Sequence, residues 1–308
     1  MNIISVKNLK KYYRVYQKEP GLWGSIKSLF VRQHYDVKAV NGVSFGIQEG
    51  ELVGFIGPNG AGKTTTLKVL SGLLFPTSGQ VQVLGFEPFK RQSEFQKKFS
   101  LVMGQKNQLW WDLPAWESFI LNKEIYEIPQ KQFEESVAKL TKMLEIEDLL
   151  KVQVRKLSLG QRMKCELVAS LLHSPKVLFL DEPTIGLDIV AQKTMRDFIK
   201  EYNEQGKATI ILTSHYMADV KELCKRVIVI DQGKILYDGL LEEIVNKFAP
   251  FKVIKVKEYS GNYMEIQVGK NEVAEKTREL LSKFKVADLT IEDPPIEDII
   301  RQIFQKGV

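Results

Sequence analysis

A glycine-rich stretch, GPNGAGKTT at residues 57–65, follows the short apolar run ELVGFI at 51–56. It fits the pattern G-x-x-x-x-G-K-[ST], which needs a strand before the loop and a helix after it. Glycines let backbone N–H groups surround phosphate oxygens, and the start of the helix adds a favourable partial charge. We therefore expect Lys63 to reach the β and γ phosphates of a nucleotide and the Thr64 hydroxyl to bind Mg²⁺. The other loop residues that we expect to contact the nucleotide are Gly57, Asn59, Gly60, Gly62 and Thr65.

Three apolar runs are continuous rather than alternating, at 52–56, 177–180 and 209–212. Such runs are typical of strands buried on both faces, as in a parallel sheet covered by helices. Apolar residues recur at helical spacing over 133–144 and 195–202, so we expect an α/β layered core. Between about 101 and 172 the pattern is mostly helical, which predicts a helical subdomain within this core.

The end of the chain has a different pattern. It contains an amphipathic helix at 240–248, alternating runs at 251–257 and 263–268, a helix near 271–284, a strand near 286–291 and a final helix. At about 150 residues per domain, 308 residues suggest about two domains. We expect a first domain over 1–239 and a small α+β module over 240–308, with an accessory role in dimerisation or regulation.

Two acidic residues follow the apolar run that ends at Leu180. A buried strand that delivers Asp181 and Glu182 at its end needs a reason, because isolated buried charge is costly. We expect Asp181 to bind Mg²⁺, usually through water, and Glu182 to polarise the water that attacks the γ phosphate. The alternative is that these acids form an N-cap for the next segment. The segment LSLGQ at 157–161 precedes a helical run, and read alone it is a Ser/Gly turn that caps a helix.

The order of these motifs over residues 1 to about 239 resembles the nucleotide-binding subunit of an ABC transporter. The resemblance is carried by GPNGAGKTT, Gln105, LSLGQ, VLFLDEPT at 177–184, GLD at 186–188 and His215. The chain looks most like ATPases paired with ABC-2 type exporter permeases. This likeness is carried by the motif DEPTIGLD, the PTSG at 76–79 and the single cassette. The resemblance implies a P-loop NTPase of ABC type with a mixed sheet core and a helical subdomain.

The resemblance also implies roles for individual residues. Tyr13 would stack on adenine, with Tyr12 as the alternative, and an aromatic face attracts a base without reading its edges. Gln105 would sense Mg²⁺ and the attacking water, and His215 would contact the γ phosphate. The implied catalytic set is Glu182, His215, Gln105 and Lys63, and the implied Mg²⁺ set is Thr64, Gln105 and Asp181.

The same resemblance implies a dimer with two ATP molecules between the copies. Ser158, Gly160 and Gln161 would meet the γ phosphate of ATP held by the opposite subunit, and Asp188 would bridge the two subunits. One departure is visible, because the family has Gly where this chain has Leu159. Leucine disfavours a positive φ. We expect the change to be tolerated, since Ser158 and Gly160 are retained.

The formal net charge is +6, from 44 Lys and Arg and 38 Asp and Glu. Residues 7–38 hold eight of these basic residues and two of the acids, so the whole excess lies there. The apolar runs are shorter than the roughly 18 residues that span a membrane, and the start MNIISVKNLK lacks the apolar stretch of a secretion signal. Cys165 and Cys224 are too few for a disulfide framework or a zinc cluster. We therefore expect a cytoplasmic location.

Two further features lie outside the shared motifs. Residues 16–36 look like an insertion with apolar residues at helical spacing and a basic charge, which predicts a short amphipathic helix. It would lie on the membrane surface or a partner, or else fold back on its own core. Trp110, Trp111 and Trp116 follow Gln105, where the family receives its permease; they would form that interface or ordinary subdomain packing.

We expect from this resemblance an ATP-hydrolysing motor that drives a separate membrane permease of ABC-2 exporter type from the cytoplasmic face. ATP and Mg²⁺ would be its cofactors, and we expect that it has no nucleic-acid partner. The alternative is a soluble ABC ATPase that acts on a partner unrelated to transport. Such proteins often have two cassettes, coiled-coil inserts or metal clusters, and this chain has one phosphate loop and two scattered cysteines.

Overall fold

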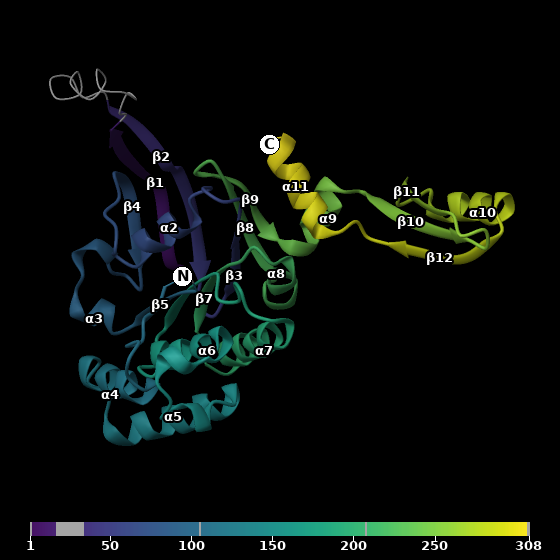
Figure 1. Cartoon of the computed structure of the whole chain (residues 1–308). Helices are drawn as coiled ribbons and strands as arrows, with labels where there is room; N and C mark the ends of the chain where they lie inside the picture. The colour runs from purple at the N-terminus through teal and green to yellow at the C-terminus, as the bar shows by residue number, and fades with distance from the viewer. Residues whose placement is uncertain (1, 17–33, 105, 207, 307–308) are drawn as a thin grey trace, which may run out of the picture. The chain divides into compact units, whose positions relative to one another are not determined.

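The computed structural model describes residues 2–16, 34–104, 106–206 and 208–306. The chain divides into two compact units, Met1–Asp238 and Gly239–Val308 (Figure 1). Gln105 and most of the segment 16–36 lie outside the described residues, so the expectations about them stay predictions. Within the described residues, none of the helices combines the length and the apolar character needed to cross a membrane.

A six-stranded sheet with the order β5-β6-β7-β3-β8-β9 forms the centre of the first unit. Its strands are β3 (Leu52–Ile56), β5 (Phe99–Met103), β6 (Val177–Asp181), β7 (Thr209–Thr213), β8 (Arg226–Asp231) and β9 (Lys234–Leu240). The pairs from β5 through β8 are parallel, and every residue of β6 and β7 is buried. The continuous apolar runs therefore form buried parallel strands, as predicted. Gln232 and Gly233 have φ of 46° and 74°, as in the two-residue hairpin turn that reverses the chain into β9.

A second sheet with the order β2-β1-β4 is antiparallel. It contains β1 (Asn2–Tyr16), β2 (His34–Gln48) and β4 (Ser78–Val83). Helix α2 (Lys63–Leu70) shares one apolar cluster with this sheet and with β3, in which Ile4, Val40, Phe55 and Leu67 are buried. This cluster fixes the start of α2 against both sheets, and the phosphate loop lies at that start.

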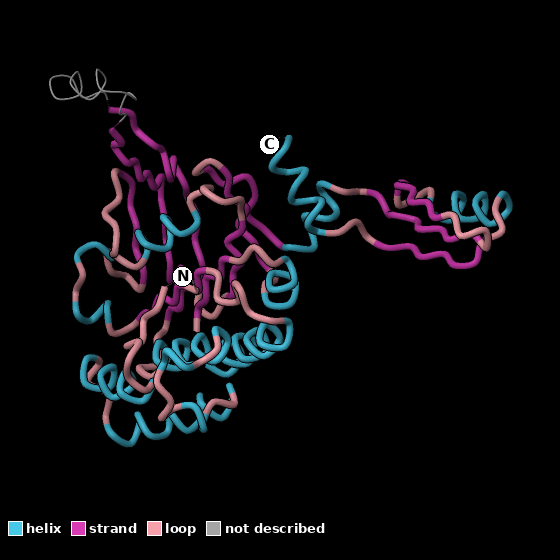
Figure 2. Tube along the Cα trace, in the orientation of Figure 1, coloured by secondary structure: helices cyan, strands magenta, loops and turns pink. Residues whose placement is uncertain are grey.

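Most helices of the first unit lie at the end opposite to the β1–β2 pairing (Figures 1 and 2). The helices of this unit after α2 are α3 (Ser93–Gln96), α4 (Ala115–Ile125), α5 (Gln130–Leu144), α6 (Leu159–Leu171), α7 (Ile189–Gly206) and α8 (Met217–Leu223), with 3-10 turns at Pro88–Lys90, Glu147–Leu149 and Val154–Lys156. Helix α5 buries Phe133, Val137, Leu140 and Leu144, the four positions at helical spacing. The region predicted as mostly helical also contains the end of β5, which the sequence did not reveal.

Within its described residues, the second unit has a three-stranded sheet and three helices. It contains α9 (Leu241–Phe248), β10 (Phe251–Glu258), β11 (Tyr263–Gly269), α10 (Val273–Lys283), β12 (Val286–Glu292) and α11 (Ile296–Lys306). The strands form an antiparallel sheet with the order β11-β10-β12, and its core buries Ile254, Val256, Val268 and Leu280. The unit therefore has an apolar core of its own, in the element order that the sequence indicates.

Candidate functional site

The phosphate loop between β3 and α2 depends on its glycines. Gly60 and Gly62 have φ of 80° and 106°, in the left-handed region that favours glycine. A Cβ at Gly57 would lie 2.1 Å from the Ile230 carbonyl oxygen, so the backbones approach too closely for any side chain. Lys63 is buried, and its Nζ donates to the carbonyl oxygens of Gly57 at 2.6 Å and Pro58 at 3.1 Å. The lysine is thus folded over the loop, whereas Asn59 is exposed and Thr65 lies half-buried in α2.

Thr64 and Asp181 meet although 117 residues separate them. The Thr64 hydroxyl donates to Asp181 Oδ2 at 2.8 Å, and the Thr213 hydroxyl donates to Oδ1 at 2.6 Å. Hydroxyl and carboxylate oxygens are the ligands that Mg²⁺ prefers, and this ion usually takes few protein ligands beside phosphates and water. These residues therefore fit Mg²⁺. Among the described residues, no group of three or more His, Cys, Asp or Glu could hold a metal.

Glu182 and His215 form the second contact of the site. His215 Nε2 lies 2.7 Å from Glu182 Oε1. The Glu182 backbone has a φ of 57°, which is strained for a non-glycine residue, and its N–H donates to the carbonyl oxygen and the hydroxyl of Thr213 at 3.0 and 3.1 Å. A carboxylate held in this way can orient and polarise a water.

The end of β5, just before Gln105, lies close to the end of β6, which carries Asp181. The N–H of Gly104 donates to the Asp181 carbonyl oxygen at 2.9 Å, and a Cβ at Gly104 would lie 2.1 Å from the Glu182 carbonyl oxygen. Only glycine permits this approach. A cavity of about 160 Å³ lies at this site. Its lining residues are Thr64, Lys68, Met103, Lys106, Asp181 and Glu182.

The charges at this site act on one another. Burial lowers the pKa of the Lys63 ammonium, and the nearby Glu182 and Asp181 carboxylates oppose that change. Sequence reasoning missed Thr213, Lys68 and Lys106. Two local signals existed, because Lys68 is one helical turn after Thr64 and Lys106 directly follows Gln105. Thr213 gave no such signal, since its contact depends on the pairing of β6 with β7.

The segment LSLGQ begins α6. Ser158 caps this helix: the N–H of Gln161 donates to Ser158 Oγ at 3.2 Å, and the N–H of Ser158 donates to Gln161 Oε1 at 2.9 Å. Leu159 is the first helical residue, and its φ is not positive. The leucine in place of the family's glycine therefore needs no unusual backbone here.

The start of α6 lies beside the start of α7. Asp188 Oδ1 accepts from the Ala191 N–H at 2.8 Å, and a Cβ at Gly160 would lie 3.2 Å from the Ala191 Cβ. Ile189 and Val190 are 82% and 76% exposed. The structure thus brings Ser158, Gly160 and Gln161 together with Asp188 and two exposed apolar side chains.

The two candidate adenine tyrosines on β1 differ in their surroundings. The Tyr12 hydroxyl donates to Asn41 Oδ1 at 2.7 Å, so its ring is anchored. Tyr13 is 37% exposed, and the Lys11 ammonium lies 5.1 Å from the centre of its ring. Tyr13 is more exposed than Tyr12, with the Lys11 ammonium over its ring, and it stays the predicted residue for stacking on a base.

Comparisons with known proteins identify the family of this chain. Residues 40–185 match the ABC transporter family model. The ABC transporter ATP-binding protein NatA of Bacillus subtilis (strain 168) is 35% identical over 208 residues, 68% of this chain and 84% of the relative. The bacitracin transport ATP-binding protein BcrA of Bacillus licheniformis is 31% identical over 270 residues, 88% of this chain and 82% of the relative. Because 270 residues exceed the first unit, this second match extends into the second unit.

A solved structure supports the fold. It is the dimeric, post-hydrolysis state of an ATP-binding cassette bound to ADP and Pi, with a TM-score of 0.64 and 23% identity over 77% of this chain and 98% of that chain. These findings do not favour the alternative of an ABC ATPase unrelated to transport. The chain belongs to the ABC transporter family, in which it is an ATP-binding subunit that hydrolyses ATP to drive transport.

Proposed function

We propose that this chain drives an exporter whose membrane part is a separate ABC-2 type permease, and that it works as a homodimer at the cytoplasmic face of the membrane. The observation that carries the proposal is the meeting of Thr64, Asp181, Glu182 and His215 in one site, while Ser158 and Asp188 share a different surface. Hydrolysis thus has its residues within one copy, and a second surface is left to face a partner copy.

The residues of the site divide the reaction between them. Lys63 would neutralise charge on the β and γ phosphates, and Thr64 with Asp181 would hold Mg²⁺. A bound Mg²⁺ would neutralise phosphate charge. Glu182 polarises the attacking water, while His215 holds the Glu182 carboxylate and contacts the γ phosphate. The Tyr13 ring would stack on the adenine base, and Gln105 would sense Mg²⁺ and the attacking water.

The partner copy supplies the other side of each ATP. Ser158, with the start of α6, presents a hydroxyl, backbone N–H groups and a favourable helix dipole to the γ phosphate of that ATP. Ile189 and Val190 bury their exposed side chains at the same contact. ATP then holds the dimer closed, and its hydrolysis removes the bridge.

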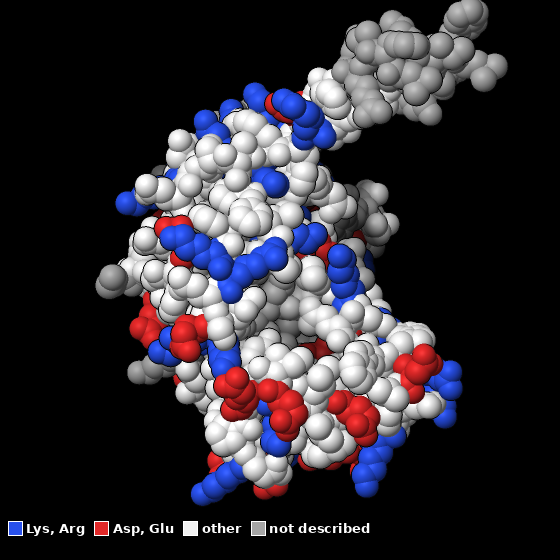
Figure 3. Space-filling model, turned by 90° about the vertical axis from the view of Figure 1, so that its left-hand side faces the viewer, with Lys and Arg blue, Asp and Glu red and all other residues white. Residues whose placement is uncertain are grey.

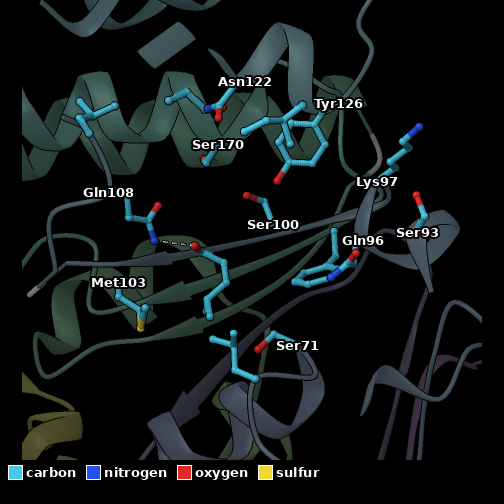
Figure 4. Close-up of a pocket in the computed structure, with 16 residues that line it drawn as sticks. Ser71, Ser93, Gln96, Lys97, Ser100, Met103, Gln108, Asn122, Tyr126 and Ser170 are labelled. Atoms are coloured by element: carbon cyan, nitrogen blue, oxygen red, sulfur yellow. Dashed lines mark hydrogen bonds between the residues drawn. The ribbon is translucent and has the colours of Figure 1, made fainter. Parts of the chain in front are cut away.

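The permease docks at a cavity of about 480 Å³ between the β5 side and the helical side of the first unit (Figure 4). Asn122, Tyr126 and Ser170 line it from α4 and α6, and Ser93, Gln96 and Lys97 line it from α3 and its end. Trp110 and Trp111 are 51% and 46% exposed and suit such an interface, whereas the Trp116 ring packs on Phe133 at 5.7 Å.

Positive charge gathers near one end of this face. Figure 3 shows Lys and Arg at its upper end, where β1 and β2 pair, and a hollow near its middle. The excess of basic residues lies within 7–38, of which residues 17–33 are outside the described part. We propose that this segment lies against the anionic inner leaflet or the permease. The second unit has an accessory role in dimerisation or regulation.

Affinity purification from detergent-solubilised membranes tests the partner. We expect a tagged chain to retain a multispan membrane protein of ABC-2 type. The change of Trp110 and Trp111 to Ser should weaken this retention, because it removes apolar area from the docking face. Tyr259→Ser, which alters an exposed ring of the second unit, is the control. Retention of soluble proteins alone would support a partner unrelated to transport.

A further inference from the structure

A buried carboxylate in α8 lies behind the catalytic pair. Asp219 is fully buried, and its Oδ2 accepts hydrogen bonds from the Thr184 hydroxyl at 2.5 Å and the Ser214 hydroxyl at 2.6 Å. Its Oδ1 accepts from the Arg196 guanidinium at 3.1 Å. Removing one partner of such a buried pair strands the other charge, so the arrangement acts as a unit.

The two hydroxyls come from the two loops of the catalytic pair. Thr184 lies two residues after Glu182, and Ser214 directly precedes His215. One carboxylate oxygen therefore bonds to both loops, whose functional side chains lie 2.7 Å apart. The strained backbone of Glu182 needs support from its surroundings to persist.

Arg196 connects this carboxylate to two helices. It lies in α7 and is 8% exposed, and its guanidinium also pairs with Glu222 of α8. The guanidinium thus holds α8 against α7 and compensates the buried charge of Asp219. The carboxylate is fixed from three elements, and the Glu182 and His215 loops are fixed to it.

We propose that Asp219 is a positioning residue for ATP hydrolysis, which holds the Glu182 and His215 loops in register with each other. It does not touch ATP; it acts through the relative placement of these two side chains. This inference rests on the proposed function, in which Glu182 and His215 act on the γ phosphate. A shift of about 1 Å at a reacting group can change a rate by about 100-fold.

Asp219→Asn in the full chain tests this role, because it keeps the size of the side chain and removes its charge. We expect kcat for ATP to fall about 10- to 100-fold, with KM for ATP changed less than about threefold, since the phosphate loop is untouched. Asp197→Asn is the matched control, because Asp197 lies one residue after Arg196 but is exposed and pairs with Lys193. It should leave kcat unchanged.

A double-mutant cycle with His215→Ala separates positioning from general damage. Measured as single-turnover hydrolysis, Asp219→Asn should slow the His215→Ala protein by less than about twofold, because the side chain to be positioned is gone. Ser214→Ala serves if Asp219→Asn does not fold, with an expected loss of about 3- to 10-fold that also disappears in the His215→Ala background. An unchanged kcat in the single variants would overturn the proposal. A reduction in rate that is as large in the His215→Ala background as in the wild type would also overturn it. Glu182→Gln is the reference: if it leaves hydrolysis intact, the proposed function itself fails.

Discussion

Glu166 shows how one residue of the first unit depends on pH. It lies in α6 with only 1% of its surface exposed, and Glu166 Oε1 accepts from the Gln108 N–H at 3.3 Å. Burial raises its pKa to about 7, although the Gln108 hydrogen bond and the Arg162 charge lower it. Near neutral pH this carboxyl is therefore partly protonated, while in the unfolded chain it is ionised.

We expect Glu166→Gln to stabilise the protein above neutral pH. The folded state holds this proton more tightly than the unfolded chain, so wild-type stability falls as pH rises from about 4.5 to about 7. Gln keeps the acceptor and has no charge to bury, so it should raise the free energy of unfolding at about pH 8 by about 1–3 kcal/mol and matter little at about pH 5. Urea unfolding of the first unit at both pH values measures this.

The matched control for Glu166 is Glu135→Gln, at an exposed position of α5. It should alter stability by less than about 0.5 kcal/mol at either pH. An equal effect of Glu166→Gln at both pH values would show that the carboxyl does not take up a proton on folding.

Local motifs predicted part of the site at the level of residues. The spacing in GPNGAGKTT placed Lys63 and Thr64, and the two acids at the end of the apolar run suggested Asp181 and Glu182. Thr213, Gly104 and Asp219 could not be found in this way. Their contacts depend on which strands are neighbours and on the register between them, and no local pattern encodes either.

At the scale of elements, α6 shows why Leu159 is tolerated. Ser158 and Gln161 form a reciprocal cap, and Leu159 occupies the first helical position with ordinary backbone geometry. Its side chain extends toward Gly186, where a Cβ would lie 2.9 Å from Leu159 Cδ2. The leucine thus fills space beside the loop that leads to Asp188.

We expect Leu159→Gly to change ATPase activity by less than about threefold and to lower the free energy of unfolding by up to about 1 kcal/mol. Glycine brings no needed conformation here and removes a packing contact. Steady-state ATPase assays and thermal unfolding check this, with Leu159→Ala as the control that shortens the side chain without freeing the backbone. A rise in activity of more than about tenfold would mean that the segment needs a glycine conformation.

Elements with a strong local pattern were predictable. Strands β6 and β7 and helix α5 follow their apolar patterns, because burial on both faces or on one helical stripe leaves a clear periodicity. Strand β5 was missed. It is a sheet-edge strand with alternating burial over five residues, and its pairing with the distant β6 decides its conformation.

At the scale of the whole molecule, the net positive charge is confined to one segment of the chain. The formal excess of +6 lies within residues 7–38, and the remaining 36 basic and 36 acidic residues balance. We therefore propose that the catalytic region binds phosphate through its loop, its helix start and Lys63 rather than through bulk charge. The second unit could be predicted as a module because its apolar positions form a core of their own.

We expect Glu182→Gln to trap a dimer in ATP and Mg²⁺. The change removes the group that polarises water and leaves Thr64 and Asp181, so ATP stays intact between two copies. The monomer is 35.3 kDa, and size-exclusion chromatography with light scattering should show about twice that mass with ATP and Mg²⁺, and the monomer with EDTA. Ser158→Arg in the same background should keep ATP binding and lose the dimer, because its bulk blocks the surface that faces the second ATP. A Glu182→Gln protein that binds ATP yet stays monomeric would contradict the sandwich, and a dimer that survives Ser158→Arg would place its interface elsewhere.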